Sequence, residues 1–112
     1  MFLKNDRKRS VGMNKKDTIV REILGWKTYS KNSWYDVEKD SFVHESYFHP
    51  EKFMEHAMLI VKRLEMFGVD YRTNGVSEVY FDDAIGRGAT LPEAITNAAY
   101  KLVKNYYAVA GK

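Results

Sequence analysis

The sequence has no cysteine and no long apolar run. Without cysteine, disulfides, thiol nucleophiles and thiolate metal sites are excluded. A transmembrane helix needs about 18 or more consecutive apolar residues, and residues 1–6 also lack the apolar stretch of a signal peptide. The length of 112 residues is common for a single domain. We therefore expect a cytosolic protein without a membrane partner, whose stability comes from packing one core.

Familiar catalytic and nucleotide-binding motifs are missing as well. The sequence contains no Gly-x-Ser-x-Gly, Walker or dinucleotide-binding pattern. His44, Glu45 and His49 form a cluster of the metal-ligand type, but two histidines five apart do not match the spacing of a zinc-binding helix. Asp82 and Asp83 would point to opposite faces of a strand. We expect no enzymatic activity, no cofactor and no bound metal.

Positive charge is concentrated in the first residues. Residues 1–16 carry six Lys and Arg against one Asp, a net charge of +5. The other 96 residues carry 12 Lys and Arg against 14 Asp and Glu, a net charge of −2. We interpret residues 1–13 as a basic, disordered extension, and residues 14–110 as a single domain. If nucleic acid binds, the expected contacts are Arg7, Lys8 and Arg9 in this tail.

Hydrophobic periodicity and turn residues predict an α+β fold. A short helix is expected up to Gly25, with Asn14 as its N-cap three residues before Asp17, and a longer one opened by Pro50 and ended by Gly68. Between them, aromatic runs separated by Asn, Asp and Ser are typical of three short strands. Asn74-Gly75 predicts a hairpin. The expected order is α-β-β-β-α-β-β-α, with a small, mainly antiparallel sheet covered on both faces by three helices in an α/β/α sandwich.

The final helix has the clearest capping signal. Thr90 can accept from the amide of Glu93, while Glu93 reaches back to the amide of Thr90. The preceding Gly86, Arg87 and Gly88 are expected to form a loop in which the backbone can approach a ligand. Together with Thr90 at the helix N-terminus, this loop is a candidate anion site. The alternative interpretation is a structural turn.

Aromatic side chains are frequent in and near the expected strands. Most should lie in the core, and alternation should send others outward, where Tyr and Trp are typical of interfaces and of base stacking. Trp34 and Tyr35, with Arg72 or Arg87, are candidate residues for binding a nucleotide-like ligand. The pair Tyr106-Tyr107 is a candidate contact in a homo-oligomer.

Several motifs together resemble the phage ABA-sandwich domain family over residues 17–105. The motifs are Ile19-Val20-Arg21-Glu22-Ile23-Leu24-Gly25-Trp26-Lys27, Trp34-Tyr35-Asp36, Phe48-His49-Pro50, the helix with Ala57, Val61 and Leu64, and Ala89-Thr90-Leu91-Pro92-Glu93-Ala94-Ile95. The resemblance implies a bacteriophage or prophage origin, an α/β/α sandwich and the host cytoplasm as location. It implies no established activity and supplies no catalytic residues.

Three functions are consistent with these observations. The first is a non-enzymatic phage accessory protein that binds a host component or a small ligand and counters antiphage defence. The second is a sponge that sequesters a nucleotide-derived immune signal. The third is a nucleic-acid-binding or antitoxin-like regulator, since residues 86–99 are similar to the end of a double-stranded-RNA-binding domain and residues 80–94 to HicB-type antitoxins. Leu91, Pro92 and Glu93 stand where the RNA-binding domain has phosphate-gripping lysines, which argues against that function.

Overall fold

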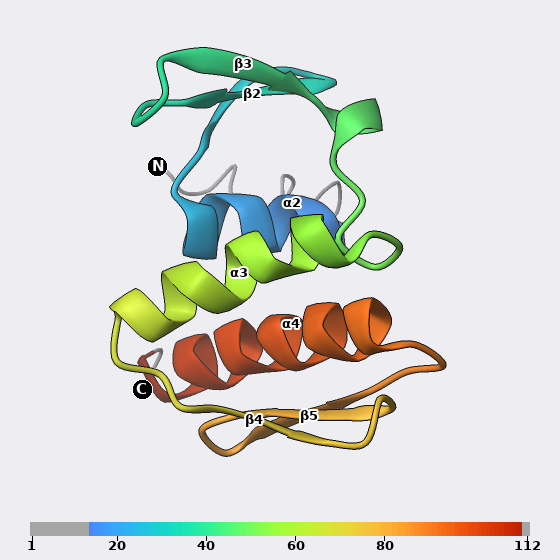
Figure 1. The fold of residues 1–112 in the computed structure, drawn as a ribbon. Coiled ribbons are helices and arrows are strands. Elements are labelled where there is room, and N and C mark those ends of the chain that lie inside the picture. The colour runs from blue at the N-terminus through green and yellow to red at the C-terminus, as the bar shows by residue number, and fades with distance from the viewer. Residues whose placement is uncertain (1–13, 111–112) are drawn as a thin grey trace.

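The computed structural model describes the backbone of residues 14–110 and the side chains of residues 14–106. Helical and extended segments alternate in groups along this part of the chain (Figure 1). Their bounds are α2 (Lys15–Ile19), the π-helical η1 (Val20–Leu24), β1 (Lys27–Ser30), β2 (Ser33–Asp36), β3 (Ser41–His44), the 3-10 turn η2 (Glu45–Tyr47), α3 (Met54–Met66), β4 (Tyr71–Asn74), β5 (Glu78–Phe81), β6 (Ala84–Arg87) and α4 (Leu91–Ala110).

The strands form two antiparallel three-stranded sheets, β1-β2-β3 and β4-β5-β6. The α+β class is confirmed, but the expected single sheet between helices is not what the chain forms. The helices lie between the two sheets instead (Figure 1). Burial alternates along β2 and β5, so each sheet has only one face that needs cover. Two such sheets can flank one helical layer, whereas a single sheet in the middle would need two apolar faces.

A sixth strand, β6, occupies the segment that was expected to be a loop. Asp82 and Asp83 form a two-residue turn that pairs Phe81 with Ala84. Asp82 takes a left-handed conformation with φ of 54°, and its Oδ1 accepts from the Asp70 amide at 2.9 Å. A short Asp side chain tolerates this backbone region, and its hydrogen bond ties the turn to the residue that precedes β4. The Asp pair therefore makes a tight turn rather than ending the sheet.

The ends of the first two helices follow their capping residues. The Asn14 side chain accepts from the Asp17 amide at 2.8 Å, as predicted, and Gly25 ends the helical segment with φ of 76°. The second helix begins at Met54 and not at Pro50, because residues 49–53 first form a turn in which the Phe53 amide donates to the His49 carbonyl. Pro50 is buried there instead of lying in the first helical turn.

The main part of the core lies between the helices and the inner face of β4-β5-β6. Among the described residues, the largest fully buried side chains are Ile19, Val20, Pro50, Ile60, Val61, Val79, Phe81 and Ile95. Under β1-β2-β3 the core is formed mainly by three aromatic rings, those of Trp26, Trp34 and Phe48. The centroid of the Trp26 ring lies 6.1 Å from that of Trp34 and 5.2 Å from that of Phe48. No helix of the described residues is both long and apolar enough to cross a membrane.

Candidate functional site

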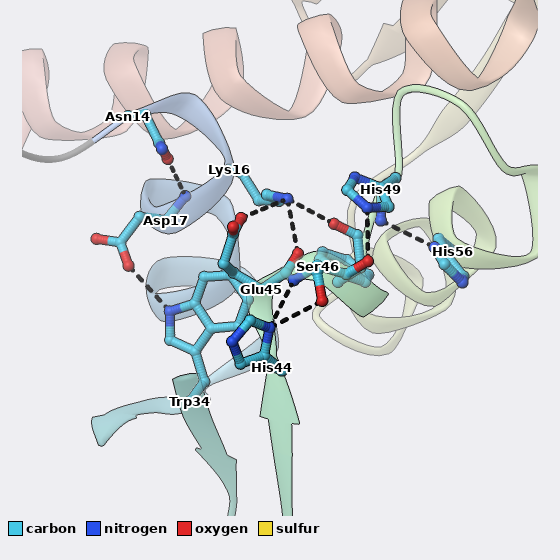
Figure 2. A network of polar contacts seen from close by, with 10 residues as sticks. Asn14, Lys16, Asp17, Trp34, His44, Glu45, Ser46, His49 and His56 are labelled. Carbon is cyan, nitrogen blue, oxygen red and sulfur yellow. Dashed lines mark hydrogen bonds and ion pairs between the residues drawn. The ribbon is translucent and has the colours of Figure 1, made fainter. Parts of the chain in front are cut away.

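Lys16 fixes the segment after β3 to helix α2 (Figure 2). Its Nζ donates to the backbone carbonyls of Glu45 at 3.0 Å and Phe48 at 2.8 Å, and lies 3.3 Å from the Glu45 carboxylate. The side chain is only 15% exposed, so the ammonium group is largely desolvated. Each of its three N–H donors has an oxygen atom as partner. Lys16 thus holds the sheet β1-β2-β3 at a set position above the helices.

Replacing Lys16 with methionine should lower the free energy of unfolding by about 2 kcal/mol, because the Glu45 and Phe48 carbonyls lose a charged donor while the apolar stem is kept. Urea denaturation followed by circular dichroism measures this loss. The matched control is Lys62→Met on the exposed surface of α3, which should change stability by less than about 0.5 kcal/mol. Equal effects of the two substitutions would show that the Lys16 contacts contribute nothing specific.

The three histidines are used for local hydrogen bonds beside this network (Figure 2). The His44 ring accepts from the Ser46 amide at 3.2 Å, the His56 Nδ1 accepts from the His49 amide at 2.9 Å, and the His49 Nε2 lies 2.8 Å from the Ser46 carbonyl. Within the described part of the chain, no three His, Asp or Glu side chains gather in an arrangement that could bind a metal ion. The histidines order the connection between β3 and α3.

Trp34 and Tyr35 point to opposite faces of β2. Trp34 is buried, and its Nε1 donates to the Asp17 carboxylate at 2.9 Å (Figure 2). Tyr35 lies on the outer face, where its hydroxyl donates to Asp40. This hydrogen bond, more than any other influence, raises the pKa of Tyr35. The two residues therefore cannot line one binding site, and only Tyr35 is available to a ligand.

The outer face of β1-β2-β3 carries a cluster of three rings, the exposed Tyr29 and Phe42 and the half-buried Tyr35, which we call the aromatic face. The Phe42 ring lies 4.6 Å from the Tyr29 ring and 5.1 Å from the Tyr35 ring. Tyr29 is 66% exposed and Phe42 is 60% exposed. Cross-strand pairing of Tyr35 with Phe42 and with Lys27 fixes this arrangement. The sequence pattern predicted outward aromatics here without identifying which ones gather.

The glycines of the expected anion loop are used for packing. Gly86 is buried in β6 against α4, where a Cβ atom would lie 2.1 Å from the Ala98 nitrogen. At Gly88 a Cβ would lie 2.8 Å from the Glu93 side chain. Thr90 accepts from the Glu93 amide at 3.4 Å, and Glu93 accepts from the Ala89 amide at 2.8 Å rather than from Thr90. These glycines let β6 and the helix start approach each other.

Arg72 and Arg87 both lie on the outer face of β4-β5-β6. The Arg87 Nε donates to Glu78 at 2.8 Å, and the Arg72 Nε donates to Asp70 at 3.0 Å while its guanidinium lies over the Tyr80 ring at 4.8 Å. Hydrogen bonds from Asn74 and Tyr80, and then from Arg87, lower the pKa of Glu78. An ionised Glu78 therefore holds Arg87 in place on this sheet.

The candidate residues are divided between the two ends of the molecule. Arg72 and Arg87 share one sheet with Tyr80, whereas Trp34 and Tyr35 belong to the other sheet on the far side of the helices (Figure 1). A single site made of these arginines with Trp34 or Tyr35 is thus not formed. Arg7, Lys8 and Arg9 lie outside the described residues. Tyr106 is 66% exposed, and the side chain of Tyr107 lies outside the described ones.

Comparison with known protein families identifies the family of this chain. The family model of the phage ABA sandwich domain matches residues 17–100, which is well over half of the sequence. The chain belongs to this family. No curated protein and no solved structure matches significantly.

Proposed function

We propose that this member of the phage ABA sandwich domain family is a bacteriophage accessory protein that works without catalysis, by binding a host protein through its aromatic face. The observation that carries the proposal is the gathering of Tyr29, Tyr35 and Phe42 on one outer sheet surface, with two of the rings at least 60% exposed. In the family context, the biological role we propose is interference with an antiphage defence in the host cytoplasm.

The chemistry of the aromatic face suits a protein partner. Tyr and Phe rings bring a large apolar area with few rotatable bonds, so they lose little entropy when a partner covers them. Lys27 pairs with Tyr35 across the strands, which places a cation beside the rings. A central aromatic group with polar or charged neighbours is typical of the energetic centre of protein interfaces.

The rigidity of the sheet also supports the proposal. The aromatic face lies on the opposite side of β2 from the buried Trp34, which is bonded to helix α2 through Asp17. The Lys16 contacts hold the end of the same sheet. A preorganised surface binds with a smaller entropic cost than a mobile one.

The test is affinity capture from a bacterial host lysate with the immobilised full-length chain and quantitative mass spectrometry. The wild-type chain should enrich a defined host protein, and the double substitution Tyr29→Ala/Phe42→Ala should reduce its capture at least about tenfold, since truncating two central rings removes well over 1.4 kcal/mol of binding. Expression of the wild-type chain, but not of this variant, should restore plating of a phage that the host restricts.

The matched control is Met66→Ala/Phe67→Ala, which removes two equally exposed apolar side chains at the end of α3. This variant should capture the partner as the wild type does. The proposal is wrong if no host protein is enriched over blank resin, or if the aromatic-face variant captures the same protein with undiminished yield.

A further inference from the structure

A groove of about 470 Å³ runs between β6 and α4, on elements that do not take part in the aromatic face. Ile85 and Arg87 line it from the strand, and Asn97, Tyr100, Lys101 and Lys104 line it from the helix. Lys101 and Lys104 are exposed, and Tyr100 is half-buried. The groove thus combines one aromatic ring with three cationic side chains.

A fourth cation reaches the same ring from helix α2. The Lys15 Nζ lies 5.7 Å from the centre of the Tyr100 ring, and the Lys104 Nζ lies 5.5 Å from it. Asn97 organises this edge of the groove, because its Oδ1 accepts from Lys15 at 2.6 Å and its Nδ2 donates to the Arg87 carbonyl at 2.7 Å. The first helix, the last helix and β6 are therefore tied together around Tyr100.

Among the described residues, the lysines of this groove have no carboxylate partner. No carboxylate is among the residues that line it, and within residues 14–106 neither Lys101 nor Lys104 forms an ion pair. Arg87 is the exception in the groove, since its Nε lies 2.8 Å from the Glu78 carboxylate. Elsewhere in the described chain Lys16, Arg21, Arg63 and Arg72 each have a carboxylate within 3.4 Å. Arg87 meets its carboxylate through Nε, which leaves its two terminal nitrogens available to a ligand.

Gathering ammonium groups without a counter-charge is unfavourable in the free protein, and it becomes favourable when an anion binds. The local excess stands out because residues 15–112, which include all four cations, carry 14 Lys and Arg against 14 Asp and Glu, a net charge of zero. An anion with a single charge would balance only one of the four cations, whereas a chain of phosphates carries several negative charges. Phosphate oxygens also match the fork of an arginine and the point charge of a lysine.

We propose that the groove between β6 and α4 binds a small polyphosphate anion, with Lys15, Arg87, Lys101 and Lys104 as its cationic contacts. The shared chemistry is the phosphate chain, which a nucleoside triphosphate or an inorganic polyphosphate can supply. A nucleoside would gain further contact with the Tyr100 ring or with the amide of Asn97. The site is independent of the aromatic face, so either proposal can fail alone.

Isothermal titration calorimetry with the full chain, in low salt, tests the site with two probes, inorganic tripolyphosphate and ATP. Both should bind, with an affinity that falls as salt is added, because exposed charges are screened. The double substitution Lys101→Gln/Lys104→Gln should weaken both about tenfold, since it removes two of the four charge contacts and both are exposed to solvent. Tighter binding of ATP than of tripolyphosphate indicates a nucleotide ligand, and equal binding indicates the phosphate chain alone.

The basic residues near the start of the chain provide the control. Arg7→Gln/Lys8→Gln/Arg9→Gln changes none of the residues proposed as contacts, so binding of both probes should stay within about twofold of the wild type. A two-dimensional NMR titration of the wild type should show the largest shifts at the amides of residues 97–105. The proposal is overturned if neither probe binds, if the groove variant binds as well as the wild type, or if the affinity is lost with the three substitutions at positions 7–9.

Discussion

Alanine at position 86 is expected to lower the free energy of unfolding by about 3 kcal/mol or more. The new Cβ atom would lie 2.1 Å from the nitrogen and 2.5 Å from the Cα of Ala98, and 2.6 Å from the carbonyl oxygen of Ala94. All three are backbone atoms of α4, so no rotamer change can relieve the overlap, and overpacking of this kind usually costs about 1–3 kcal/mol even where side chains can adjust. The melting temperature should fall by roughly 10 °C or more.

Thermal and urea denaturation followed by circular dichroism measure this effect, and the neighbouring Ile85 supplies the control. Ile85 lies on the exposed face of β6, opposite the buried Gly86, and is 38% exposed. Ile85→Thr keeps a β-branched residue and should therefore cost less than about 1 kcal/mol. Wild-type stability in Gly86→Ala would mean that β6 does not pack closely on α4 in solution. The groove proposed for polyphosphate would then lose its geometric basis as well.

Signals that depend on near neighbours in the chain predicted the local structure well. Asn14 caps the first helix as its spacing with Asp17 indicates, because the hydrogen bond spans three residues. The hairpin predicted from Asn74-Gly75 is confirmed, but its turn spans residues 75–77, with Gly75 at φ of 67°, and Asn74 pairs with Glu78 as the last residue of β4. Such features depend only on the conformational preferences of a few consecutive residues, so they can be predicted directly from the sequence.

The number and layering of the sheets could not be predicted in the same way. The alternation of apolar and polar residues along a strand indicates that one of its faces is apolar. It does not predict which strands pair or which helix covers that face. The sequence does not predict β6, because glycines such as Gly86 are typical of loops. In the structure Ala84 and Gly86 are two small residues on the same face of this strand. The matching small residues Ala94 and Ala98 on α4 were the signal that this strand and helix pack at close range.

The two proposed binding surfaces differ in how far the sequence could reveal them. On β2 the alternation of Trp34 and Tyr35 already separates an inner from an outer aromatic, and the aromatic face follows once β2 pairs with its neighbours. The polyphosphate groove combines Lys15 with residues more than 80 positions later. Only the packing of α2 beside α4 brings these charges together, so no sequence motif predicts the groove.

Truncation of Trp34 to alanine should cost about 3–5 kcal/mol, as for large aromatic side chains in other cores. Trp34 is 5% exposed, contacts Trp26, and donates to Asp17. It is the main apolar contact between its sheet and the core, because every residue of β1 is exposed and β3 contributes a single side chain, Val43, which is only partly buried. Without Trp34 the sheet β1-β2-β3 should separate from the helices, and binding through the aromatic face should fail with it.

Hydrogen exchange distinguishes this local separation from global unfolding. In Trp34→Ala the amides of β1, β2 and β3 should lose protection before those of α4 and β5, since the latter are held by the main part of the core. The control is Val37→Ala, just beyond the end of β2, where a 50% exposed side chain is shortened at little cost. Uniform loss of protection in Trp34→Ala would mean that the two sheets unfold as one unit, and that the aromatic face depends on the whole core instead of on a single ring.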